Sequence, residues 1–249
     1  MEYEFDAKKT ADSLVENTRA FLKDALREPK VVLGISGGKD SAIAATICAR
    51  AIGAENVLGV MMPNGQQRDI SDSINVCESL GIRHTTVNIG PAYEALTGSI
   101  FDCDDDSIVS DRESLVNVGP RLRMTTLRYI AQQQGALLCG TGNLSESFVG
   151  YCTKDGDTSC DFNPLGSLTS IEVVKVGECF EECPSQVVHK TPDDGLSGMS
   201  DEEKMGITYQ MIHDHIRFGS CGDERGDKEI DRRHKASAHK RRMPHVITA

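Results

Sequence analysis

Short apolar runs alternate with longer amphipathic stretches through the first 140 residues of the chain. Residues 31–35 form a β-branched run typical of a buried strand, and the stretch after it has alanine and isoleucine at helical spacing. The same alternation recurs further along the chain. It predicts strands at 31–35, 56–62, 83–89 and 136–140, and helices at 11–27, 39–53, 69–80 and 112–134.

Glycine and proline mark where these elements end. Pro29 ends the first helix and Gly135 the last, and the pair Gly119–Pro120 predicts an interruption within residues 112–134. Two polar loops, 102–106 and 193–203, are rich in aspartate. The second is long enough to act as a lid, which we expect to close over a site.

Strands that alternate with helices at this spacing predict an α/β fold, with a Rossmann-like parallel sheet and helices on both faces. We see no internal repeat and no linker, so residues 1–249 are expected to form a single domain. Ligands of such sheets bind at the carboxyl ends of the strands. Two glycine-containing motifs, SGGKDS after the first strand and GTGNLSE after the fourth, lie at such ends.

The first motif, residues 36–41, differs from the Walker A loop. Lys39 is followed by Asp40 rather than serine or threonine, and Gly34 stands four residues before Gly38 instead of five. Glycines at a helix N-terminus still favour phosphate, because backbone N–H groups can face an anion there. A carboxylate in such a nest needs a bridging cation, so Asp40 implies Mg²⁺ between itself and phosphate oxygens. The alternative is a simple glycine turn in which Asp40 is the N-cap residue of the helix.

The motif Ser-Gly-Gly-x-Asp-Ser resembles the loop of the ATP pyrophosphatase superfamily, whose members release pyrophosphate from ATP and activate an oxygen as an adenylate. Later motifs narrow the resemblance. In order and spacing the chain is similar to ammonia-dependent NAD synthetases through NVGPRLRM (117–124), GTGNLSE (140–146), and the stretches 151–169, 190–209 and 238–244.

That resemblance implies an adenine nucleotide alpha-hydrolase-like fold, a homodimer, and amidation of deamido-NAD with ammonia, ATP and Mg²⁺ through an NAD-adenylate. Only about thirty residues precede the first strand, so we expect no glutamine-hydrolysing domain and ammonia that is free or supplied by a separate partner. The alternatives are another ATP-pyrophosphatase ligase, GMP synthetase-like or tRNA-thiolating, and a non-catalytic nucleotide-binding regulator.

The resemblance also implies roles for individual residues. Asp40 and Glu146 would hold the metal, Lys39 would offset charge on the departing pyrophosphate, and Asp161 would help to deprotonate ammonium. The residues expected around ATP are Gly34, Ile35, Ser36, Gly37, Gly38, Lys39, Asp40, Ser41, Thr141, Ser170 and Asp193. Those expected to contact deamido-NAD are Arg121, Lys154, Asp161, His239 and Lys240.

Two positions depart from the family pattern. Ser170 stands where the family usually has a lysine that contacts ATP, and Asp193 stands where it usually has serine or threonine. Loss of a cation and gain of an anion both weaken phosphate contacts. Lys175 and Lys190 are the candidates to compensate, or Asp193 recruits a metal.

Composition agrees with a small-molecule enzyme. The net charge of −11 argues against nucleic acid as a partner, although residues 225–242 carry eight Lys/Arg against three Asp/Glu. We expect this basic segment, within 225–249, to contribute to the substrate site. Nine scattered cysteines, no signal-peptide pattern and no long apolar stretch predict a cytoplasmic protein that does not engage a membrane.

Overall fold

The computed structural model describes residues 3–66, 70–105, 107–108, 111–190, 200–243 and 245–247. Its sheet has four parallel strands in the order β3-β2-β1-β4. The strands are β1 (Val31–Gly34), β2 (Val57–Met61), β3 (Arg83–Thr86) and β4 (Leu137–Leu138). All four strands predicted from the hydrophobic pattern, and the parallel sheet itself, are therefore confirmed.

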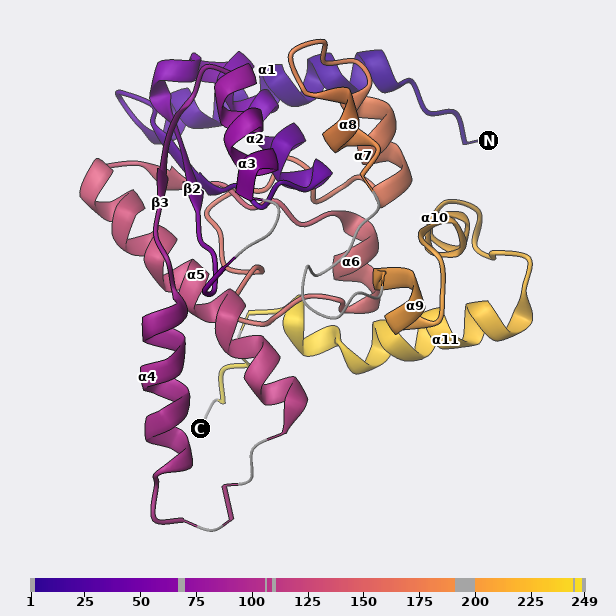
Figure 1. The fold of residues 1–249 in the computed structure, drawn as a ribbon. Coiled ribbons are helices and arrows are strands. Elements are labelled where there is room, and N and C mark those ends of the chain that lie inside the picture. The colour runs from indigo at the N-terminus through magenta and orange to yellow at the C-terminus, as the bar shows by residue number, and fades with distance from the viewer. Residues whose placement is uncertain are drawn as a thin grey trace.

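Helices cover both faces of this sheet (Figure 1). On one face, α2 (Lys39–Ile52) packs against α1 (Ala7–Ala25), α7 (Ser170–Gly177) and α8 (Ser185–Val188). The other face is covered by α5 (Arg112–Gln134), which contacts β1 and β4. Each face has its own apolar core, and the two sides of β1 contribute to different cores because successive strand residues point in opposite directions.

Helix α5 runs without a break through Pro120, so the predicted interruption is wrong. Proline normally disfavours a helical residue before it through a clash with that residue's Cβ. The preceding residue here is Gly119, which has no Cβ. The helix ends at Gly135, which adopts the left-handed conformation expected of a C-terminal cap.

Two further helices link the strands. The first, α3 (Ile70–Ser79), was predicted, whereas α4 (Gly90–Phe101) was not. Helix α4 packs against α5, and together α4 and the N-terminal half of α5 form an arm that extends away from the sheet (Figure 1).

The remaining helices form a second, smaller layer beside the sheet. They are α6 (Leu144–Val149), α9 (Asp201–Met205), α10 (Tyr209–Phe218) and α11 (Glu224–Ala236), followed by the 3₁₀ turn η2 (Ala238–Lys240). Val149, Ile212 and Ile230 are at the centre of their shared apolar cluster. Among the described residues, no helix has the length and apolar character needed to cross a bilayer.

The strand order determines where a ligand can bind. Strand β1 lies between β2 and β4, so the chain leaves β1 toward one side of the sheet and later returns on the other. The carboxyl ends of β1 and β4 are therefore adjacent, and the loops after them lie at the point where the strand order reverses.

Candidate active site

The loop between β1 and α2 is shaped by glycine. Gly37 has φ = +79°, and a Cβ there would lie 3.1 Å from Ser73 Oγ and 3.2 Å from Asp72 Cβ. The N-cap residue of α2 is Gly38, and no side chain of the described residues caps this helix. Asp40 is therefore not the N-cap, and the first-turn amides of α2 remain available to an anion.

Two serines hold the loop in shape. The Ser41 hydroxyl donates to the Gly38 carbonyl at 3.0 Å and accepts from the Ser36 amide at 3.2 Å. The Gly38 amide in turn donates to Ser36 Oγ at 3.2 Å. Both hydroxyls are thus used in forming the cradle, in addition to any contact they make with phosphate.

A lysine from a distant segment lies beside the same loop. Lys190 donates to Asp72 Oδ2 at 2.7 Å, and Asp72 itself packs against Gly37. Of the two lysines considered as compensation for Ser170, Lys190 is therefore the one that the described contacts bring to the phosphate loop.

Asp40 is surrounded by groups from three parts of the chain. Its Oδ2 lies 2.6 Å from the Lys39 ammonium, and its Oδ1 accepts from Asn143 Nδ2 at 3.2 Å. Lys39 is also 5.7 Å from the centroid of the Tyr209 ring, a distance that allows a cation–π contact. The loop after β1, the motif after β4 and helix α10 therefore meet at the Lys39–Asp40 pair.

Glu146 occupies the third position of α6 and faces the same carboxylate. Its Oε2 accepts from the Asn143 amide at 3.0 Å, while the Asn143 side chain accepts from the Glu146 amide, which forms a capping box. Burial and the negative charge of Asp40 raise the pKa of Glu146 to about 8, although Lys39 opposes the shift. Glu146 has no counter-charge of its own, because Lys39 is paired with Asp40, so the two carboxylates together fit a site for an added divalent cation.

Among the described residues, no group of three or more His, Cys, Asp or Glu side chains is arranged to hold a metal ion. The protein side chains therefore do not form a complete metal site by themselves. Asp40 and Glu146 supply two oxygen-bearing groups. Mg²⁺ is usually held by one or two carboxylates together with substrate phosphates and water. The pair therefore matches a magnesium ion that arrives with a nucleotide.

Arg121 and Lys154, both expected at the dinucleotide, lie together. Arg121 Nε donates to the Lys154 carbonyl at 3.3 Å, and next to it Thr153 Oγ1 donates to Asn117 Oδ1 at 2.7 Å. These contacts fix the loop after α6 against α5. The Lys154 side chain extends from a loop that α5 holds in place.

Both carboxylate oxygens of Asp161 are engaged by contacts within the protein. One of its oxygens pairs with Arg128, and the other accepts from the Leu138 amide of β4 at 2.8 Å. This arrangement anchors the loop to the sheet.

The basic segment near the end of the chain closes helix α6. Lys240 donates to the carbonyls of Gly150 and Cys152 at 2.9 and 2.6 Å, and Arg241 donates to the Ser147 carbonyl at 2.8 Å. These carbonyls lie in the last turn of α6 and just beyond it, where they lack intrahelical partners. His239 is exposed on the η2 turn.

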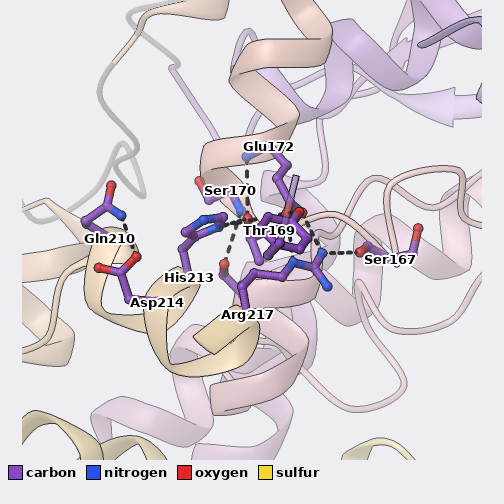
Figure 2. A network of polar contacts seen from close by, with 10 residues as sticks. Ser167, Thr169, Ser170, Glu172, Gln210, His213, Asp214 and Arg217 are labelled. Atoms are coloured by element: carbon purple, nitrogen blue, oxygen red, sulfur yellow. Dashed lines mark hydrogen bonds and ion pairs between the residues drawn. The ribbon is translucent and has the colours of Figure 1, made fainter. Parts of the chain in front are cut away.

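Ser170 is buried, and its amide donates to Ser145 Oγ at 3.1 Å. It begins helix α7, in which Thr169 and Glu172 form a second capping box. Figure 2 shows Glu172 paired with Arg217 of α10, with His213 hydrogen-bonded to Thr169. A serine at position 170 is thus part of the packing between helices.

The other expected positions lie as follows. Thr141 lies three residues after the end of β4 and is partly exposed. Gly34 is the last residue of β1, and Ile35 follows it. Asp193, and residues 193–199 of the expected lid, lie outside the described residues. Residues 200–203 begin α9.

Sequence reasoning missed two residues of this centre, Asn143 and Tyr209. Asn143 positions both Asp40 and Glu146, and its N-x-x-E spacing in GTGNLSE is a capping-box signal that could have revealed its role. Tyr209 covers Lys39, and its hydroxyl lies 3.4 Å from Asp201, which also accepts from Tyr151 at 3.0 Å. No local pattern points to these contacts, because they join segments that are far apart in the sequence: α10 to α2, and α9 to Tyr151.

A glycine-rich loop at a helix N-terminus, two converging carboxylates and a strand-order reversal together define a nucleotide-binding α/β enzyme of the doubly wound type. The model of the family described as NAD synthase matches residues 14–244. The chain belongs to this NAD synthase family, and the family, ligase class and fold expected from the sequence are confirmed.

Individual relatives agree. An NH(3)-dependent NAD(+) synthetase of Thermococcus kodakarensis is 39% identical over 80% of this chain and 77% of its own. The NMN synthetase of Francisella tularensis has a TM-score of 0.88 and 32% identity, covering 99% of this chain and 100% of the other. An NH3-dependent NAD synthetase from Campylobacter jejuni has a TM-score of 0.80 at 25% identity, covering 98% and 100%.

Proposed function

We propose that this chain uses ATP, Mg²⁺ and ammonia to convert deamido-NAD to NAD, AMP and pyrophosphate. The observation that carries the proposal is the meeting of Asp40 and Glu146, through Asn143, beside a phosphate loop at the switch point of the sheet. A non-catalytic nucleotide-binding regulator would not need both carboxylates. Family membership selects the reaction among those that such a loop supports.

In the first step, a nicotinate carboxylate oxygen attacks the α-phosphorus of ATP and the bond to the β-phosphate oxygen breaks. Pyrophosphate leaves, and the product is an NAD-adenylate. The loop of residues 34–41 holds the phosphates with its amides, and Asp40 with Glu146 would hold Mg²⁺. When bound, Mg²⁺ supplies positive charge against the phosphate oxygens.

In the second step, ammonia attacks the activated carbonyl carbon, AMP leaves with the bonding electrons, and the nitrogen loses a proton. No protein nucleophile is needed, so the chain acts by positioning and by electrostatics. Thr141 and Lys39 belong to the ATP side of this proposal. Arg121, Lys154, Asp161, His239 and Lys240 form its dinucleotide side.

The direct test is to mix the purified protein with ATP, MgCl₂, deamido-NAD and an ammonium salt and to detect NAD by mass spectrometry. Reactions without ammonium or without Mg²⁺ are the controls. NAD that forms only in the complete mixture supports the proposal. Pyrophosphate release without NAD would indicate another ATP-pyrophosphatase ligase, and ATP binding without turnover would indicate a regulator.

A second candidate substrate, nicotinate mononucleotide, is suggested by one of the structural matches. The Francisella tularensis protein that matches this fold with a TM-score of 0.88 is an NMN synthetase, whose name implies amidation of nicotinate mononucleotide. That substrate carries the same carboxylate but lacks the adenylate half. The ratio of kcat/KM for the two substrates decides between them: a value above one for deamido-NAD over the mononucleotide supports NAD synthesis.

We also propose a homodimer. Apolar side chains are exposed along the arm formed by α4 and α5: Leu96 and Ile100 are 43% and 40% exposed, and Phe101 is 54% exposed. Such a surface is typical of a protein interface. Sedimentation analysis should give twice the chain mass, and Ile100→Lys with Phe101→Lys should give a monomer. The apolar segments 11–27 and 121–138 are further candidates for the interface, and they expose one aromatic side chain each, Phe21 and Tyr129.

The proposal also covers domain organisation, the source of ammonia and the cellular compartment. Residues 1–249 act as one synthetase domain, with 225–249 contributing to the substrate site, and ammonia arrives free or from a separate glutaminase. All nine cysteines are free thiols, which supports a reducing compartment such as the cytoplasm.

A further inference from the structure

Lys39 has an unusual environment for a lysine. Its side chain is only 5% exposed, and it is the first residue of α2, where the positive end of the helix dipole disfavours a cation. A lysine in such a place needs a close anionic partner. That partner is Asp40, whose Oδ2 lies 2.6 Å from the lysine ammonium.

Adjacent residues of a helix do not normally face each other, so this pairing needs the Lys39 side chain to fold back over the first turn. The Tyr209 ring, 5.7 Å from the ammonium, supports that conformation. Tyr209 is itself buried and reaches Asp201 through its hydroxyl. The ammonium is therefore held by Asp40 and by an aromatic ring.

The same oxygen of Asp40 cannot serve a lysine and a divalent cation together. Mg²⁺ binds carboxylate oxygens at about 2.0–2.1 Å with near-octahedral geometry. An ammonium 2.6 Å from Oδ2 occupies that space and repels the metal. A metal ion can bind Oδ2 only after Lys39 has left it, and the nearby ammonium also weakens metal binding at the other oxygen, Oδ1.

We propose that Lys39 is the resident counter-ion of Asp40 and makes tight binding of a divalent cation conditional on nucleotide. The inference rests on the proposed function, since it takes Asp40 and Glu146 as the metal site. The lysine neutralises Asp40 while the loop is empty. ATP brings its own negative charge to the loop, which offers the displaced ammonium a new partner and so couples the two binding events.

The test measures Mn²⁺ binding to metal-free protein without nucleotide, by electron paramagnetic resonance. Lys39→Gln removes the competing charge, so its Mn²⁺ affinity should rise about tenfold or more. Lys39→Arg keeps the charge and should bind like the wild type. Lys8→Gln is the control, because it removes a lysine from another lysine–aspartate pair, with Asp12 at 2.8 Å on the exposed face of α1.

A second measurement examines the coupling. A non-hydrolysable ATP analogue should increase Mn²⁺ affinity more in the wild type than in Lys39→Gln, because only the wild type has a lysine to displace. If Lys39→Gln does not fold, Lys39→Met, which preserves the apolar stem, carries the same expectation. An unchanged or weaker Mn²⁺ affinity in these folded variants would overturn the inference.

The outcomes separate this inference from the proposed function. If the wild type makes NAD but loss of the lysine does not tighten Mn²⁺ binding, the counter-ion role alone is wrong. If the wild type makes no NAD while Lys39→Gln tightens Mn²⁺ binding, the counter-ion role stands and the proposed reaction fails. Weaker binding of the nucleotide with unchanged Mn²⁺ affinity would instead make Lys39 a phosphate ligand only.

Discussion

Helices α6 and α7 begin with the same local motif. In α6 the motif belongs to the candidate active site, whereas in α7 it joins helices to one another. Each has a capping box in which a glutamate at the third position accepts from the N-cap amide: Asn143 with Glu146, and Thr169 with Glu172. Locally the two starts are alike. They differ in what surrounds the two carboxylates.

Glu172 is completely buried and fully neutralised. Arg217 donates to it from Nε at 2.7 Å and from Nη2 at 2.6 Å, the Thr169 amide donates at 2.8 Å, and Tyr3 donates as well. With its lone pairs used in this way, the carboxylate has little capacity left for a ligand. It joins α7 to α10 (Figure 2).

Glu146 faces another carboxylate instead of an arginine. Asp40 and burial raise its pKa to about 8, and the nearest positive charge, Lys39, is already paired with Asp40. A carboxylate group that lacks a full counter-charge is stabilised by an added cation. The comparison teaches that a capping glutamate is structural or functional according to the charge that tertiary contacts supply.

The largest effect is expected when the structural glutamate, Glu172, is replaced. Glu172→Gln leaves Arg217 without its carboxylate in a largely buried place, so the free energy of unfolding should fall by about 3–5 kcal/mol. Urea unfolding measures this change. Activity per folded molecule should remain close to that of the wild type.

Two variants control that result. Glu229→Gln removes a surface glutamate that pairs with Arg232 at 2.7 Å, and it should cost under about 1 kcal/mol. The double variant Glu172→Met with Arg217→Met should recover much of the loss, since no charge is left buried. Equal losses from Glu172→Gln and Glu229→Gln would contradict a neutralised core pair.

The next largest effect is expected when the candidate metal ligand, Glu146, is replaced. Glu146→Gln keeps the hydrogen bond of the capping box but removes a metal ligand, so the rate of NAD formation should fall roughly 10²-fold or more. Stability should stay within about 1 kcal/mol, because a side-chain amide oxygen can still accept from the Asn143 amide. Steady-state assays over a range of Mg²⁺ concentrations measure the rate.

Glu203 provides the matched control, since it forms an exposed capping box with Ser200 in α9. Glu203→Gln should leave the rate unchanged. A wild-type rate in Glu146→Gln would remove Glu146 from the metal site.

A smaller effect is expected when the two N-cap residues, Asn143 and Thr169, are replaced. Asn143→Ala and Thr169→Ala should each lower the free energy of unfolding by about 1 kcal/mol, the usual cost of losing an N-cap side chain. Only Asn143→Ala should also slow the reaction, because Asn143 donates to Asp40. Thermal unfolding and activity assays on both proteins measure the difference, and an equal loss of activity would show that the two caps are equivalent.

The smallest effect concerns pH. Burial lowers the pKa of His213; Glu172 and Asp214 oppose the shift, whereas Arg217 and Lys175 add to it. Below about pH 6.5 the unfolded chain therefore binds a proton that the folded protein resists, and stability falls as pH decreases. Urea unfolding at pH 7.5 and 5.5 should show a larger loss in the wild type than in His213→Gln. The reverse order would mean that His213 is charged in the folded protein.

Much of the sheet was predictable because its signals are local. Strands β1, β2 and β4 are short apolar runs bounded by glycine or proline, β3 lies in an alternating stretch after Gly81, and the loop after β1 is readable from six consecutive residues, 36–41. The break expected at Pro120 did not occur, since the helix continues where Gly119 removes the steric conflict. Helix α4 was missed although Pro91 stands at its start, a favoured place for proline.

The centre was predictable only in part. Asp40 and Glu146 belong to motifs, so the sequence pointed to both. The partners of these residues come from remote segments: Tyr209 is 170 positions after Lys39, and Arg217 is 45 positions after Glu172. Nothing in the local pattern distinguishes a glutamate that will meet an arginine from one that will meet an aspartate.

The closure of α6 by Lys240 and Arg241 has a consequence for the order of synthesis. The helix has only six residues and carries Glu146 in its first turn, while its last turn is held by side chains made about ninety residues later. A nascent chain can assemble β1 to β4 while these lysine and arginine residues are still inside the ribosome. We therefore expect a nascent chain that has not yet released Lys240 and Arg241 from the ribosome to bind nucleotide weakly.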